Sequence, residues 1–217
     1  MSSRAAELRL IYSDGSVVIA DKPSGVDSEK GLPELVSEAL ADSGQTGEIY
    51  TVHRLDRMTS GLILLARTKK AAAALSASVA AGELDKRYIA LVGGIPDPPE
   101  GEMEDLLFFD RRQGRSYTVN RERKGVRAAH LAYTLLSVDK EKARSLVSVK
   151  LFTGRTHQIR VQFASRGMPL CGDRRYGSRE PPDSYLLRAV YLSFPHPDTG
   201  RTLEFSLEYP DDISFFN

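Results

Sequence analysis

One acidic residue stands among basic ones in the segment "VHRLDRMTSG" (52–61). Asp56 lies between Arg54 and Arg57, just before a Thr-Ser-Gly turn. Nearby guanidinium groups lower the pKa of a carboxyl group and keep it ionised, which suits a nucleophile better than a general acid. The turn would present the side chain on a loop, where functional groups are common. Taken alone, the same pattern is more often a structural ion pair.

Other catalytic chemistries find little support in the residues. The four histidines are scattered and lack the partner spacing of zinc motifs, so we expect no metal. Glycine-rich nucleotide loops and the Gly-x-Ser-x-Gly elbow are absent from the sequence. A glycosidase would need a second carboxylate, and the nearest parallel, Asp173, belongs to a turn in "CGDRRYG". The single Cys171 fits a reducing compartment and is interpreted as a packing residue.

Charge is distributed unevenly along the 217 residues, although the formal net charge is only +1. Residues 1–110 carry 11 Lys/Arg against 18 Asp/Glu, and residues 111–217 carry 19 against 11. A polyanion-binding half would explain this asymmetry, and a solvated charged face explains it equally well. The run "LILLA" (62–66) is too short to span a bilayer, and no secretory leader is evident, so we expect a soluble, cytoplasmic protein without membrane contact.

The candidate residues lie on or between several predicted helices and strands. Helices and strands are mixed along the chain, with many antiparallel strand pairings expected and no βαβ series. Hydrophobic periodicity and turn residues predict the following strands: two in 8–25 around Asp14-Gly15, then 62–66, 86–94, 129–138, 143–152, 185–194 and 201–210. Helices are predicted at 32–44, from an N-cap at Thr68, and at 156–167 with Thr156 as its cap. The Pro- and acid-rich segment 95–104 is predicted to be a surface loop.

Four segments in order resemble the RluA-type pseudouridine synthases. They are "HRLDRMTSG" (53–61), "KRYIALV" (86–92), "TGRTHQIRVQFASRGMPLCGDRRYG" (153–177) and "LLRAVYLSFPHP" (186–197). The opening "IADKPSG" (19–25) is also similar to that family. The resemblance covers the chain from about Leu10 to the final strand. It implies isomerisation of uridine to pseudouridine in RNA, with neither cofactor nor metal.

The resemblance also implies an α+β fold, the pseudouridine-synthase fold. Its long, bent, mixed and mostly antiparallel sheet is flanked by helices and loops around a central catalytic cleft. We expect residues 1–217 to form a single catalytic domain, whose two halves share one sheet, without an accessory N-terminal RNA-binding domain. A monomer acting on a ribosomal or transfer RNA stem-loop is expected. Arg188 and Tyr185 depart from the residues common in the family, which bears on target preference rather than on chemistry.

Catalytic roles are carried over by position. Asp56 matches the aspartate that attacks the target nucleoside, at either C1′ of the ribose or C6 of the base. Tyr88 matches the tyrosine that stacks on the base and takes part in removing the C5 proton. Arg160 matches the basic residue that pairs with the aspartate. Without the resemblance, Tyr88 would be read as a half-buried strand tyrosine.

Four further residues are expected to bind the RNA. Arg54 matches an arginine that displaces the target uridine from its stack, and Leu187 matches an apolar residue beside the base. Arg155 and His157 lie where a loop enters a predicted helix, a position that favours phosphate. The basic stretch 111–127, with seven Lys/Arg against one Glu, is either an RNA contact or a mobile charged hairpin.

Two other functions are compatible with parts of this pattern. A catalytically silent RNA-binding module would keep the basic half, but binding alone does not need a carboxylate facing phosphates. A nucleoside or glycoside hydrolase would use Asp56 but would lack the second carboxylate. We therefore favour an RNA pseudouridine synthase.

Overall fold

A computed structural model of the chain describes residues 8–208, which fall into two compact units. Among these residues, the first unit comprises 8–86 and 188–207, and the second comprises 87–187 and 208. The chain passes between the units within strand β5 (Asp85–Gly93) and at the start of strand β10 (Leu187–Pro195). None of the helices in the described part is long and apolar enough to cross a membrane.

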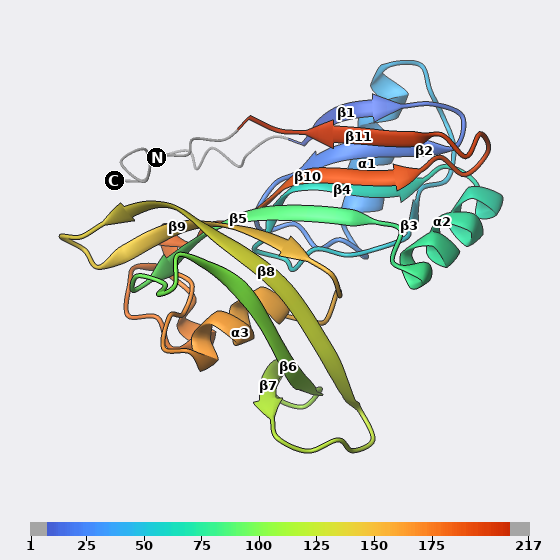
Figure 1. The fold of residues 1–217 in the computed structure, drawn as a ribbon. Coiled ribbons are helices and arrows are strands. Elements are labelled where there is room, and N and C mark those ends of the chain that lie inside the picture. The colour runs from blue at the N-terminus through green and yellow to red at the C-terminus, as the bar shows by residue number, and fades with distance from the viewer. Residues whose placement is uncertain (1–7, 209–217) are drawn as a thin grey trace. The chain divides into compact units, whose positions relative to one another are not determined.

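The first unit is built on neighbouring strands in the order β1-β2-β4-β10 (Figure 1). Their bounds are Arg9–Ser13 for β1, Val17–Lys22 for β2 and Ser60–Ala66 for β4, and the short strands β3 (Tyr50–Thr51) and β11 (Thr202–Ser206) pair with β4 and β10. All these pairs are antiparallel except β4 with β10, where Gly61 lies opposite Ala189. Strand β4, "SGLILLA", is apolar on both faces because both faces are covered.

Two helices complete the first unit. Helix α2 (Lys69–Ala81) packs its Ala71 and Leu75 against alternate residues of β2, β4 and β10. It begins at Thr68, whose hydroxyl accepts a hydrogen bond from the Ala71 N–H, and ends at Gly82 in the left-handed conformation. Helix α1 (Leu32–Asp42) buries the apolar side chains Leu32, Val36 and Leu40. The N-cap at Thr68 confirms the sequence prediction.

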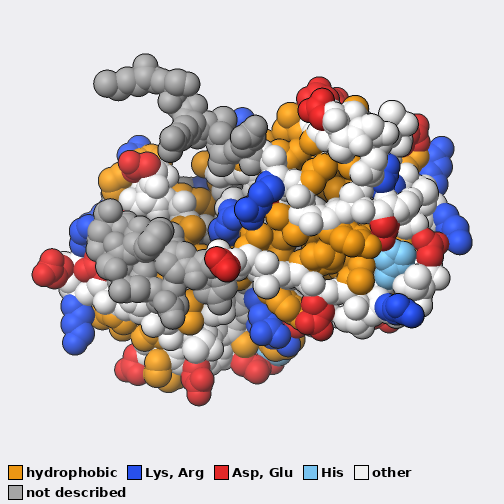
Figure 2. All heavy atoms as spheres, turned by 90° about the horizontal axis from the view of Figure 1, so that it is seen from above, with side chains coloured by type: hydrophobic (Ala, Val, Ile, Leu, Met, Phe, Trp, Pro, Cys, Tyr) orange, Lys and Arg blue, Asp and Glu red, His pale blue; other side chains and the backbone are white. Residues whose placement is uncertain are grey.

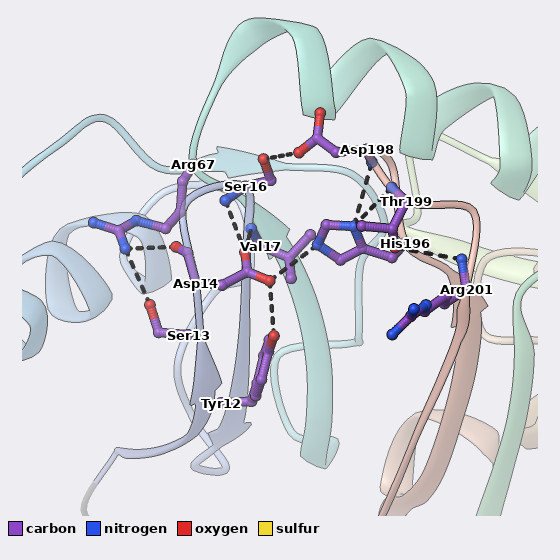
Figure 3. A network of polar contacts seen from close by, with 10 residues as sticks. All are labelled: Tyr12, Ser13, Asp14, Ser16, Val17, Arg67, His196, Asp198, Thr199 and Arg201. Carbon is purple, nitrogen blue, oxygen red and sulfur yellow. Dashed lines mark hydrogen bonds and ion pairs between the residues drawn. The ribbon is translucent and has the colours of Figure 1, made fainter.

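A polar network joins the two hairpin turns of the first unit (Figure 3). One oxygen of Asp14 accepts the backbone N–H groups of Ser16 and Val17 at 2.7 and 2.9 Å, which closes the β1–β2 turn. The other oxygen accepts the Tyr12 hydroxyl at 2.8 Å and the Nε2–H of His196 at 2.9 Å. His196 lies between β10 and β11, so one carboxylate fixes both turns.

The edge strands β1 and β11 also carry apolar surface. Seen from above, hydrophobic side chains gather over the part of the first unit that these strands occupy (Figure 2). Partly buried side chains from both strands pack on the core cluster: Ile11, Tyr12, Leu203 and Phe205. The rings of Tyr12 and Phe205 lie 5.4 Å apart, so the two edges are held together by aromatic contact as well as by the polar network.

The second unit carries strands in the order β5-β9-β8-β6-β7. Their bounds are Arg144–Leu151 for β9, Val126–Asp139 for β8, Glu100–Asp110 for β6 and Arg115–Val119 for β7. Helix α3 (Gln158–Ser165) packs on β6 and β7, and Gln162 Nε2 donates to the Met103 carbonyl of β6 at 3.0 Å. Its Phe163 ring meets the Tyr133 ring of β8 edge-on. Two short 3-10 helices follow, at Arg174–Tyr176 and Pro182–Ser184.

The structure confirms the predicted mixed, mostly antiparallel sheet with few helices. It adds strands that were not predicted, among them β6 and β7, and it corrects the bounds of α3. Strand β6 begins at Glu100, so the Pro-rich loop predicted at 95–104 is shorter. The basic stretch 111–127 contains strand β7. Helix α3 covers only Gln158–Ser165, and its N-cap is His157 rather than Thr156. The end of the strand predicted at 201–210 lies outside the described residues. The sharing of one sheet by two halves around a central cleft stays a prediction.

Candidate active site

Asp56 is half-buried on the segment 53–61, which leads into the first two residues of β4 and is here called the aspartate loop. This loop is fixed to the segment 22–28 of the same unit. The connection centres on Lys22, which is fully buried at the end of β2. Its ammonium group donates to the carbonyls of Pro23, Val26 and Arg57 at 3.0, 2.9 and 3.2 Å. An ammonium group has three protons, so these three acceptors match its full donor capacity.

Burial lowers the pKa of Lys22 to about 8, and the negative charges of Asp27 and Asp56 oppose that shift. Lys22 is thus still mostly protonated at neutral pH. Its charge lies close enough to Asp56 to interact with it electrostatically. The sequence predicted that an arginine would supply the positive charge near Asp56. In the structure, Lys22 of "DKPSG" supplies a positive charge from within the same unit.

Further contacts fix the backbone on both sides of Asp56. The Ser28 hydroxyl accepts the Leu55 N–H at 3.2 Å and donates to the Leu55 carbonyl at 2.9 Å. The Gly25 N–H donates to the Arg57 carbonyl at 2.8 Å, and Arg57 Nε donates to the Gly25 carbonyl at the same distance. Arg57 is therefore used for backbone attachment. Ser28 was missed by the sequence analysis, because a lone serine carries no motif signal.

His53 and Gly61 fix the two ends of the aspartate loop. His53 Nε2 accepts the Leu64 N–H at 3.0 Å, which places the ring proton on Nδ1. Burial, with a contribution from the charge of Lys86, lowers the pKa of His53 to about 3, so its ring is neutral. Gly61 has a φ of 107°, and a Cβ there would lie 2.1 Å from the Ala189 carbonyl oxygen. The glycine of "TSG" is required for the close approach of β4 and β10.

Arg54 is exposed, and its guanidinium lies 3.5 Å from the Glu29 carboxylate. The charge of Arg54 also contributes to lowering the pKa of Asp27, after the N–H donors of Glu29 and Lys30. An exposed ion pair of this kind stabilises the fold little, so the guanidinium can exchange partners at low cost. The expectation that it displaces a uridine stays a prediction.

Arg160 lies on α3 in the second unit and is nearly buried. Its Nε donates to Asp173 Oδ2 at 2.6 Å and its Nη2 donates to Asp173 Oδ1 at 2.9 Å. The guanidinium also lies 5.0 Å from the ring centroid of Tyr176. From the sequence, Asp173 was expected only to belong to a turn, and its pairing with Arg160 was not predicted. Because Arg160 and Asp56 belong to different units, their pairing stays a prediction.

Arg155 and His157 do lie at the start of α3, as predicted, but the geometry differs from a simple cap. His157 has a φ of 56°, in the left-handed region, and its Nδ1 lies 2.9 Å from the Tyr176 hydroxyl. Gln158 Oε1 accepts the Arg155 N–H at 3.0 Å, and Arg155 Nε donates to the Ala128 carbonyl at 2.8 Å. The loop is therefore rigidly attached to β8. Phosphate binding by these residues stays a prediction.

Tyr88 and Leu187, the remaining predicted site residues, are both 5% exposed. Tyr88 lies on β5, and Leu187 is the first residue of β10. Cys171 is buried, and burial raises the pKa of its thiol to about 11, so its interpretation as a packing residue is consistent with the structure.

One group of described residues has the composition of a metal site. Ligand atoms of Glu102, Glu104 and His130 lie within 4.8 Å of one another on the paired strands β6 and β8. Both glutamates are exposed, and His130 Nε2 already donates to Glu102 at 2.8 Å. Nothing else in the described part of the chain indicates an ion at this position.

Comparison with solved structures identifies the fold. A human protein described as RNA Pseudouridylate Synthase Domain Containing 1 superposes with a TM-score of 0.79 at 23% identity, covering 97% of this chain and 86% of that chain. Human RNA Pseudouridylate Synthase Domain Containing 4 gives a TM-score of 0.75 at 21% identity, covering 95% and 89%. The fold is therefore that of pseudouridine synthase domains, as the sequence predicted.

Comparison of sequences gives the family. The family model described as RNA pseudouridylate synthase matches residues 16–165. The dual-specificity RNA pseudouridine synthase RluA of Escherichia coli is 32% identical over 203 residues, which cover 91% of each chain. An RNA pseudouridine synthase of Mycobacterium bovis is 33% identical over 222 residues, covering 95% of this chain and 70% of its own. This chain belongs to the RNA pseudouridylate synthase family, whose members are isomerases.

Proposed function

We propose that this chain isomerises specific uridines of structured RNA to pseudouridine and that Asp56 is its nucleophile. The observation that carries the proposal is the attachment of the aspartate loop. A buried ammonium, a serine hydroxyl and a paired glycine fix the backbone on either side of Asp56. Fixing a reacting group in one orientation lowers the entropic part of the barrier. A merely structural surface carboxylate would not need such support.

The proposed reaction consumes no cofactor because it only moves one bond. Asp56 attacks the nucleoside at C1′ or at C6, and the N1–C1′ bond breaks. The uracil turns so that C5 bonds to C1′, and the bond to Asp56 breaks, which regenerates the free carboxylate. The C5 proton is then lost, and N1 gains a proton. Tyr88 is proposed to stack on the base and to take part in removing the C5 proton. Arg160 is proposed to pair with Asp56, which would require its guanidinium to serve two carboxylates, Asp173 and Asp56.

The proposed substrate is a stem-loop of ribosomal or transfer RNA, in line with the dual specificity named for the Escherichia coli relative. Arg54 would displace the target uridine, and Leu187 would pack beside the base. Arg155 and His157 would contact the RNA backbone. An enzyme that works on a stacked base must extrude it, at a cost of about a few kcal/mol. We also propose that the protein acts as a monomer in the cytoplasm.

The test compares Asp56→Asn with the wild type. We expect pseudouridine formation to fall by at least about a thousandfold, because Asn keeps the shape of the side chain but is not a nucleophile. RNA binding should stay within a few-fold of wild type. Asp42→Asn, at the exposed end of α1, is the matched control and should be fully active. The measurement is pseudouridine mapping on ribosomal and transfer RNA incubated with each protein, and full activity of the Asp56 variant would refute the assignment.

A further inference from the structure

Phe152 is an exposed aromatic side chain at the start of the loop that leads into α3. Its exposure is 46%, in a chain whose other exposed large hydrophobic residues, within the described part, are Leu35, Met58 and Ile95. It follows the last residue of β9 and precedes "TGRTHQ", which carries Arg155. Single exposed apolar residues are common on protein surfaces, so exposure alone indicates little. The position of Phe152 beside a loop proposed to bind RNA is the informative feature.

The ring of Phe152 is held in one place. It stacks on the imidazole of His130, with the ring centroids 4.2 Å apart and the planes at 27°. Its backbone N–H donates to the His130 carbonyl at 3.1 Å, and the Thr153 hydroxyl accepts the His130 N–H at 2.9 Å. His130 is itself held by the Glu102 carboxylate at 2.8 Å. The aromatic ring is therefore supported by a second ring and by a rigid backbone.

The charged residues near this ring lie on different strands: Lys150 lies on β9, and Glu102 and Glu104 lie on β6, on the other side of β8. The Lys150 ammonium lies over the Phe152 ring, 5.5 Å from its centroid. Arg155, three residues after Phe152, donates from Nε to the Ala128 carbonyl of β8. Glu102 and Glu104 lie on the side of His130, where they would repel a phosphate. A base stacked on this ring would take the place of the Lys150 ammonium, and Lys150 and Arg155 would then be available to contact phosphates.

We propose that Phe152, supported by His130, is a stacking platform for an unpaired base of the RNA substrate. This inference rests on the proposed function for the nature of the ligand. Every base has a π-face, so stacking on an aromatic ring contributes affinity with little sequence preference. Proteins recognise RNA loops largely by stacking splayed-out bases on aromatic side chains. Phe152 would thus orient a nucleotide that is not itself modified.

The test uses the full chain carrying Asp56→Ala, so that binding is measured without turnover. The probes are 12-nucleotide oligouridylates, each with 2-aminopurine at a different position. Stacking on Phe152 should quench 2-aminopurine fluorescence at one position or at two adjacent positions. In the same background, Phe152→Ala and Phe152→Leu should remove this quenching and weaken binding, measured by fluorescence anisotropy, about tenfold. Phe152→Trp should keep both the quenching and the affinity.

The matched control is Ile95→Ala, because Ile95 is 47% exposed and lies in the same unit. It should change neither quenching nor affinity by more than about twofold, the scatter of ordinary surface substitutions. The proposal is overturned if Phe152→Leu binds RNA as tightly as the parent, because an aromatic ring would then not be needed for binding at this position. It is also overturned if no probe position is quenched in the parent.

Failure of this inference is distinguishable from failure of the proposed function. The Phe152 comparison measures binding and is independent of whether Asp56 reacts. Pseudouridine mapping with Asp56 intact tests the reaction and would not reveal a missing base contact. If Phe152→Ala binds RNA normally while the wild type forms pseudouridine, only the stacking platform is refuted.

Discussion

The aspartate loop of the first unit and the start of α3 in the second unit hold their charged residues in different ways. In the aspartate loop, the contacts from Lys22, Ser28 and Gly25 reach backbone atoms of Leu55 and Arg57, on both sides of Asp56. In α3, Asp173 holds the side chain of Arg160 itself, through two hydrogen bonds. The first arrangement fixes where the chain runs, and the second fixes where a functional group points.

This difference suits the two roles that we propose. A nucleophile must change its bonding during the reaction, so its surroundings are best fixed through the backbone. A guanidinium that stabilises an anion must keep its position and its positive charge during the reaction. Two hydrogen bonds to one carboxylate hold the guanidinium in position. Mutations in the two regions should therefore differ in their effect on stability. Loss of Asp173 leaves the buried charge of Arg160 without its partner, whereas loss of Lys22 or Ser28 leaves buried backbone carbonyl groups without a donor.

The largest effect is expected for Asp173→Ala. Removing one partner of a buried ion pair leaves the Arg160 guanidinium uncompensated, and such changes cost about 3–5 kcal/mol. Urea unfolding measures the loss of stability, and Asp183→Ala, at an exposed position of the second 3-10 helix, is the control. A loss below about 1 kcal/mol would mean that Arg160 finds another partner readily, which would weaken the contrast drawn between the two regions.

A somewhat smaller loss is expected for Lys22→Met. Methionine fills a similar volume but leaves three carbonyl groups without the ammonium, and we expect a loss of about 3 kcal/mol. Pseudouridine formation should fall further than stability explains, since the aspartate loop would no longer be fixed. The control is Lys30→Met, which removes an exposed lysine of the same unit. Equal stability of both variants in urea unfolding would contradict the role given to Lys22.

The pH dependence of stability provides a third comparison. Burial lowers the pKa of Lys22 to about 8, from 10.5 in the unfolded chain. Between these values the unfolded chain binds more protons, so the contribution of Lys22 to the free energy of unfolding rises with pH. Relative to Lys22→Met, the wild type should therefore gain on the order of 2 kcal/mol from pH 8 to pH 10.5. Urea unfolding at several pH values measures this difference, and a difference that falls with pH would have the wrong sign.

The sequence predicted most of the fold because its local signals agree with one another. The Asp14-Gly15 turn, the Thr68 cap and the apolar run of β4 each specify an element without help from distant residues. Strand β6 was not predicted, because its first residues are acidic and alternate with Gly101 and Met103. That alternation is weak in the sequence and becomes a strand only through pairing with β8.

The candidate site was predicted less completely, for a physical reason. Asp56 and Arg160 could be assigned from motifs, but the groups that hold them are ordinary residues brought close by folding. Lys22 and Asp173 are 34 and 13 positions away from the residues they support. Burial makes such groups important, and burial cannot be read from residue type. Ser28 is the clearest case, since nothing in its sequence context marks it.

The smallest predicted effect is that of Ser28→Ala, and it tests the aspartate loop most closely. Both backbone groups of Leu55 would lose a buried partner, and we expect stability to fall by about 1 kcal/mol. If the hydroxyl positions Asp56, kcat should fall several-fold while KM stays nearly constant, because RNA contacts are untouched. Ser76→Ala, on the exposed side of α2, is the control and should change neither quantity. A rise in KM at constant kcat would assign Ser28 to substrate binding, and the backbone of the loop would then be fixed by Lys22 and Gly25 alone.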